Sequence, residues 1–117
     1  MNRTYRAIDL VRKDVVICDW HYERADPTPV YFVMKGLSVI TCPWRKPGLA
    51  VLQTQDMYRL RKQATPEMKN NYQGMMQTVW SDAGSFLDEF YGLKKAGPES
   101  PSACFKALFE EIKKGML

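Results

Sequence analysis

Several classes of residue and segment are scarce in this chain of 117 residues, and each shortage excludes a class of protein. No apolar run approaches the roughly 20 residues of a membrane span, and the polar, basic N-terminal residues do not resemble a signal peptide. The sequence as given therefore predicts a soluble protein that is not exported, with no membrane partner; its localisation beyond that stays open.

The scarcity of cysteine and histidine limits the chemistry that the side chains can perform. Three cysteines are an odd number, which excludes a complete disulfide framework. Because His21 stands alone and no Cys-x-x-Cys pair is present, we expect no metal site and no cofactor. Cys18 and Cys42 fall inside predicted strands, where cysteine acts as a small buried apolar residue.

The net charge of +4 is modest, and no glycine–aromatic nucleic-acid motif accompanies the basic residues. Lysine and arginine alternate with acidic residues, a pattern typical of solvated helix faces. We therefore expect no nucleic-acid partner. A hydrophobic content of 45% predicts a folded chain, and its length predicts one domain spanning residues 1–117.

Three short apolar runs, at residues 14–19, 37–42 and 75–80, read as buried strands. Helical patterns cover residues 4–12, 28–36, 47–63, 65–74 and 85–91, and a last helix follows Pro101, with Thr28 and Ser100 as N-caps. Strands joined by helical crossovers run parallel, so the sequence predicts an α/β fold. The stripes expected to face the core are Leu49, Leu52, Met57 and Leu60 in the long helix and Phe105, Leu108, Phe109, Ile112 and Met116 in the last.

Aromatic and polar residues follow the predicted strands, and all three tryptophans of the chain lie there. The carboxyl ends of parallel strands meet at one edge, where α/β proteins bind ligands. Indole faces stack on the C–H faces of pyranose rings, so this edge predicts a sugar pocket. We expect its substrate-binding residues to be Trp20, Trp44, Trp80, Asp19, His21, Glu23 and Asp82.

Three parallel strands are few for a complete α/β domain, because a closed (β/α)8 barrel takes about 250 residues. The first predicted element is a helix with no strand before it. The sequence is therefore interpreted as the C-terminal βα units of such a barrel, a partial TIM barrel.

The segments DVVICDWHYE (14–23), GLSVITCPW (36–44) and GMMQTVWSD (74–82) resemble the last three barrel strands of β-hexosaminidase-like proteins of glycoside hydrolase family 20. The resemblance covers roughly residues 14–91. It implies retaining hydrolysis of terminal N-acetylhexosamine, with the substrate's acetamido oxygen as nucleophile. Trp80 would then line the sugar pocket, Asp82 would stand where the family has a glutamate, and Trp20 would match a sixth-strand tryptophan.

The catalytic Asp-Glu pair of that family follows its fourth strand, and no such pair follows a predicted strand here; Asp88-Glu89 falls in a predicted helix. We therefore expect no catalytic residue in this chain. Three hypotheses remain: a sugar-binding part of a glycosidase, a carbohydrate-binding module that does not cleave, or a structural fragment. Open strand edges predict self-association, or pairing with the missing part of a barrel, under all three.

Overall fold

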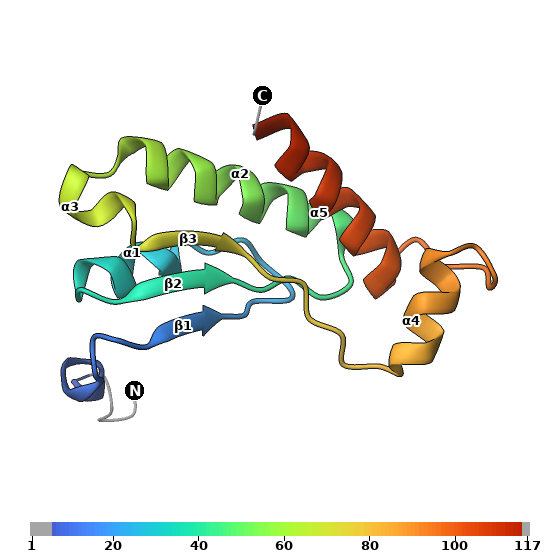
Figure 1. The fold of residues 1–117 in the computed structure, drawn as a ribbon, viewed down its shortest axis with the longest axis horizontal. Helices are drawn as coiled ribbons and strands as arrows, with labels where there is room; N and C mark the ends of the chain where they lie inside the picture. Colours follow the sequence, from blue (N-terminus) through green and yellow to red (C-terminus); the bar gives the residue numbers. More distant parts are fainter. Residues whose placement is uncertain (1–5, 116–117) are drawn as a thin grey trace.

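The computed structural model describes residues 6–115 and is an α/β fold with one three-stranded parallel sheet (Figure 1). The α/β class and the parallel sheet are thus confirmed. In chain order the elements are η1 (Ala7–Leu10), β1 (Val16–Asp19), α1 (Thr28–Met34), β2 (Ser38–Thr41), α2 (Pro47–Gln63), α3 (Pro66–Lys69), β3 (Tyr72–Met75), α4 (Ala83–Phe90) and α5 (Pro101–Gly115).

The strands follow one another in the sheet in the order β1-β2-β3, all parallel. Val16 pairs with Ser38 and Asp19 with Thr41, so β1 and β2 end level. Helix α1 connects the first two strands, while α2 and α3 connect the second pair. All three strands therefore deliver the residues that follow them to the same edge.

The predicted position of the third strand, residues 75–80, was wrong, because the strand lies earlier in the chain. It covers Tyr72–Met75, because Gly74 does not end a helix but stands inside the strand with φ of 123°. The pairing passes from Val39↔Tyr72 to Ile40↔Gly74, so one extra residue of β3 forms a bulge. A glycine meets the backbone geometry of this bulge without strain.

The predicted helix at 4–12 was also wrong within the described residues, and its first two positions lie outside them. Only one 3₁₀ turn, η1, forms, and none of its residues is buried. Leu10 is 87% exposed, so no apolar face holds this segment against the sheet. An ion pair of 2.9 Å between Asp9 and Lys35 connects it to the end of α1.

Helices cover one face of the sheet. In Figure 1, α1 lies behind the strands, α2 and α5 lie beyond β3, and none of the helices of residues 6–115 crosses in front. Val33 of α1, Met57 of α2, Val39 and Tyr72 form one buried cluster on the covered face. A second cluster of Ala50, Cys104 and Leu108 joins α2 to α5, the most extensive helix pairing of the fold.

The other face of the sheet is open. Along β1 the side chains of Val16 and Cys18 are exposed, whereas Ile17 is half-buried and Asp19 is buried. The prediction that Cys18 is buried was therefore wrong, because that prediction assumed a sheet covered on both sides. Cys42 is buried, as predicted, and burial together with the neighbouring Cys18 raises the pKa of its thiol to about 12.

Two helix starts show how local chemistry fixes the elements. Ser100 caps α5 as predicted, since its Oγ accepts the backbone N–H of Ala103 at 3.2 Å. Thr28 does not cap α1: it is the first residue of the helix, and its hydroxyl donates to Asp19 instead. No helix within residues 6–115 is both long and apolar enough to cross a bilayer.

Candidate functional site: the aromatic rim

The three indoles gather at the carboxyl edge of the sheet, around one tyrosine. We call Trp20, Tyr22, Trp44 and Trp80 the aromatic rim. The rings of Trp20 and Tyr22 stack with centroids 5.4 Å apart, and Trp44 is tilted against Tyr22 at 5.5 Å. The Nε1–H of Trp80 donates to the hydroxyl of Tyr22. One phenol ring thus connects tryptophans that follow three different strands.

The chain beyond β3 reaches the rim because backbone hydrogen bonds continue past the strand. The N–H of Met76 donates to the carbonyl of Thr41, and that of Thr78 to the carbonyl of Pro43, each at 2.9 Å. The Thr78 Oγ1 also lies 3.1 Å from the hydroxyl of Tyr22. This extended segment carries Trp80 to the rim although it is no regular strand.

Beside the rim lies an open cleft of about 320 Å³. Glu23 lies at this cleft with Lys46 Nζ at 2.6 Å and Arg45 at 4.0 Å. The hydrogen bond and charge of Lys46 hold the pKa of Glu23 below its ordinary value, so this carboxylate is ionised at neutral pH. The cleft is lined by Trp20, His21, Tyr22, Glu23, Arg24, Asp26 and Trp44.

The side chain of His21 is held by the buried carboxylate of Asp19. Asp19 is only 7% exposed, and its Oδ1 lies 3.1 Å from Nε2 of His21. Its other oxygen accepts the hydroxyl of Thr28 at the start of α1. The backbone carbonyl of His21 accepts from the amide of Gln53 in α2 at 2.9 Å. The imidazole thus has a fixed position at the cleft, whereas Asp19 serves to orient it.

Trp44 is fixed by its neighbours and keeps one donor free. Its backbone carbonyl accepts from the side-chain amide of Gln77, and the guanidinium of Arg45 lies 4.9 Å from the ring centroid. Its Nε1–H is buried and has no partner among the described residues. The ring of Trp44 is thus fixed by its backbone carbonyl, by Arg45 and by Tyr22.

Asp82 lies at the start of α4, away from the cleft. Its Oδ2 accepts the N–H of Ser85 at 2.9 Å and the hydroxyl of the same serine at 3.1 Å, which makes it the N-cap. These hydrogen bonds lower the pKa of Asp82 from its ordinary value. The geometry thus assigns Asp82 a structural task that the sequence did not predict.

Of the seven sequence-predicted residues, the structure brings Trp20, His21, Glu23 and Trp44 to one cleft, connects Trp80 to them and places Asp19 below; Asp82 is not among the lining residues. The residue whose role was missed is Tyr22. Its spacing of two from Trp20 was the available signal, because alternate residues of an extended segment share a face.

The Asp-Glu pair of the sequence does not line the cleft. Asp88 and Glu89 lie in α4, as predicted, and Glu89 accepts the hydroxyl of Ser102 at 3.0 Å. Within residues 6–115, no group of three or more histidine, cysteine or acidic side chains could hold a metal ion. The cleft can therefore stack on an apolar face and hydrogen-bond to hydroxyls.

No protein-family model matches this chain, and no curated protein matches it either.

Proposed function

We propose that this chain supplies the carbohydrate-binding wall of a β-hexosaminidase-like glycoside hydrolase site, without the catalytic Asp-Glu pair. The observation that carries the proposal is the aromatic rim: three indoles from three strand ends, joined by Tyr22 beside a polar cleft. Sugar rings have an apolar C–H face and hydroxyls around the edge, and they need both kinds of contact.

The exposure of the indoles supports a role in binding. Trp20 is 58% exposed and Trp80 67% exposed, whereas large aromatic rings without a ligand are normally buried. Both are nevertheless held in place by Tyr22. Rings that are ordered and exposed lose little entropy when a sugar stacks on them. Glu23 and His21 supply an acceptor and an imidazole for its hydroxyls.

The architecture supports an origin in a (β/α)8 barrel. Parallel strands with helices on one face are what a part of such a barrel contains, and its ligand site lies at the carboxyl ends of the strands. In a closed barrel the open face of this sheet would be the interior. The alternative is a carbohydrate-binding or structural module that closes its open face with a second copy.

Titration with N-acetylglucosamine, followed by tryptophan fluorescence and by amide shifts, tests the binding proposal. We expect saturable quenching that is lost in Trp80→Ala. Tyr91→Ala is the matched control, because Tyr91 is 71% exposed but lies at the end of α4, outside the rim. Equal binding by the two variants, or shift changes confined to α4 and α5, would contradict the assignment to the rim.

A chromogenic N-acetylglucosaminide tests the absence of catalysis. We expect no turnover by this chain alone. Any turnover would contradict the proposal, and turnover that survives in Glu23→Gln and His21→Gln would show that the acid is neither of these cleft residues. Light scattering tests the open sheet that both readings share: self-association is expected under each, and a dispersed monomer contradicts the open half-barrel.

A further inference from the structure

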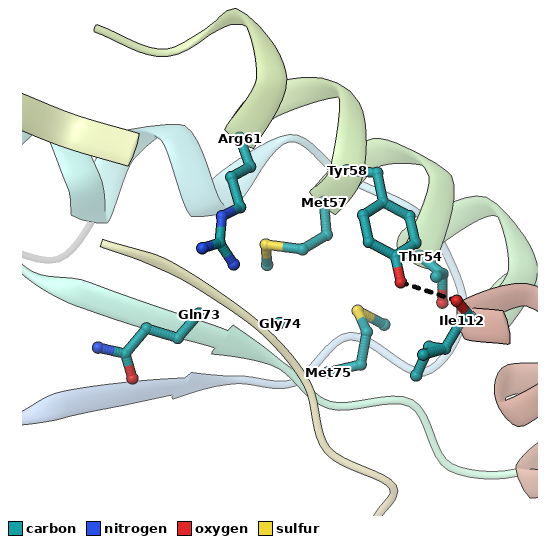
Figure 2. A pocket seen from close by; sticks show the side chains of 8 residues that line it. All are labelled: Thr54, Met57, Tyr58, Arg61, Gln73, Gly74, Met75 and Ile112. Carbon is teal, nitrogen blue, oxygen red and sulfur yellow. Dashed lines mark hydrogen bonds between the residues drawn. The ribbon is translucent and has the colours of Figure 1, made fainter. Parts of the chain in front are cut away.

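A second cavity lies between α2, β3 and α5, on the covered side of the sheet (Figure 2). We call it the α2–α5 pocket. Its volume of about 350 Å³ falls within the range of small-molecule sites, about 300–1,000 Å³. It shares no lining residue with the cleft of the aromatic rim. Thr54, Met57, Tyr58, Arg61, Gln73, Gly74, Met75 and Ile112 line it.

Most of its wall is apolar. Met57, Met75 and Ile112 present sulfur and carbon atoms, and the ring of Tyr58 completes the wall (Figure 2). The polar atoms of this wall are already bonded within the protein. The hydroxyl of Tyr58 donates to the carbonyl of Ile112 at 3.1 Å, and that of Thr54 to the carbonyl of Ala50 at 2.7 Å. The wall therefore favours an apolar occupant.

One positively charged side chain, that of Arg61, lies beside these apolar residues. The guanidinium of Arg61 points from α2 toward β3, beside Met57 (Figure 2). In the part of the chain that the structure describes, Arg61 makes no ion pair, although Arg59 of the same helix pairs with Asp56 at 2.9 Å. Gln73 of β3 also lines the pocket, but its exposed side chain points away from Arg61 (Figure 2).

The surroundings of Arg61 extend the positive charge. Arg61 and Tyr58 also line a neighbouring hollow of about 390 Å³ with Lys62, Lys69 and Gly115. Neither lysine pairs with a carboxylate within residues 6–115. A Cβ at Gly115 would meet the ring of Tyr58, so a larger residue there would require this ring to shift. The apolar α2–α5 pocket thus adjoins a hollow lined by positively charged side chains.

We propose that the α2–α5 pocket binds a small carboxylate with an apolar body, the carboxylate on Arg61 and the body against Met57, Met75 and Ile112. A guanidinium matches a carboxylate with two parallel N–H donors. Arg61 is exposed, so a neutral apolar molecule would gain only the contacts with the wall and none with this charge. This inference is independent of the function proposed for the rim.

Octanoate and the neutral octan-1-ol, titrated into the ¹⁵N-labelled full chain, test the proposal by amide shifts. We expect octanoate to perturb Met57, Gly74 and Ile112 and to bind more tightly than the alcohol. Arg61→Gln should weaken octanoate binding about tenfold and leave the alcohol unaffected. Arg59→Gln, which removes the same charge two residues away, should change neither.

A second variant separates loss of the site from loss of the fold. Arg61→Lys keeps the positive charge but loses the two parallel N–H donors, so octanoate should bind more weakly than to the unchanged chain but more tightly than to Arg61→Gln, while the amide spectrum of the free protein is kept. The proposal is overturned if octan-1-ol binds as tightly as octanoate, if Arg61→Gln and Arg59→Gln behave alike, or if the shifts appear at the aromatic rim instead.

Discussion

The two faces of the sheet differ in burial although the same four-residue strands form both. On the covered face Val39 is completely buried and Tyr72 is 5% exposed. On the open face Val16 is 42% exposed, and the row continues through Cys18 to Trp20 at the carboxyl edge. Helices α1 and α2 pack only against the first of these faces.

The difference separates stability from recognition. The covered face holds the chain together, because burial of apolar area is the main stabilising contribution. The open face contributes little to the fold of the single chain. Parallel sheets are normally covered on both sides, so the open face is the part of this molecule suited to a further layer. The rim lies where the two faces end.

Introducing the same aspartate on two neighbouring strands, once on each face, should give the largest difference in stability between the faces. Val39→Asp buries a carboxylate without a partner, which costs several kcal/mol, and a domain of this size has only about 5–15 kcal/mol in total. We expect this variant to be unfolded by circular dichroism.

Val16→Asp puts the same charge on the open face. Its free energy of unfolding should change by less than about 0.5 kcal/mol, measured by urea denaturation. If the chain self-associates through this face, the variant should also shift light scattering toward the monomer. A strong loss of stability in Val16→Asp would show that the open face is covered after all.

The sequence predicts the parallel sheet and the long helix α2 well, because turn residues and apolar runs are local signals. The prediction fails where packing between distant segments determines which side chains are buried. In α2 the buried residues are Ala50, Gln53, Thr54 and Met57, while Leu52 is 54% exposed. The helix packs against α5 through the small residue Ala50. Of the predicted stripe, Met57 is buried and Leu60 packs against the same core cluster, whereas Leu52 points outward.

The last helix shows the same limit. Leu108 is buried as predicted, but Phe109 is 52% exposed, and Phe105 packs against Phe86 and Phe90 of α4 instead. Met116 lies outside the described residues. At the rim, composition alone located the indoles, whereas the central place of Tyr22 depends on a hydrogen bond from a residue 58 positions away. No local pattern carries such a bond.

The acidic groups of the carboxyl edge give the next contrast. Asp19 lies on the covered side and accepts from Thr28 while it holds His21. Asp19→Ala should lower the free energy of unfolding by about 1–3 kcal/mol, because it removes the contacts of a carboxylate with the half-buried side chains of Thr28 and His21. Asp19→Asn keeps an acceptor and should cost less. Glu23→Ala, on the exposed side, should leave the denaturation midpoint unchanged; equal losses would remove the distinction.

A smaller effect should follow acidification at α4, which has no buried residue. The pKa of Asp82 is lowered in the folded chain, so its capping contribution is complete above the unfolded pKa and is lost as pH falls through the folded one. The amide shift of Ser85 should therefore titrate below the ordinary aspartate pKa of about 3.9. In Asp82→Asn the same shift should stay flat; a titration that persists there must come from another group.

Thiol labelling compares the two faces of the sheet in the folded protein, without a substitution that changes its stability. Cys18 is exposed on the open face, while burial raises the pKa of Cys104 to about 11 and that of Cys42 to about 12. Since the thiolate is the reacting form, iodoacetamide at neutral pH should modify Cys18 first and reach the other two only after unfolding. If a second copy covers the open face, labelling of Cys18 should slow as protein concentration rises and recover in Val16→Asp. Labelling that is fast at every concentration would leave that face uncovered in solution and count against closure by self-association.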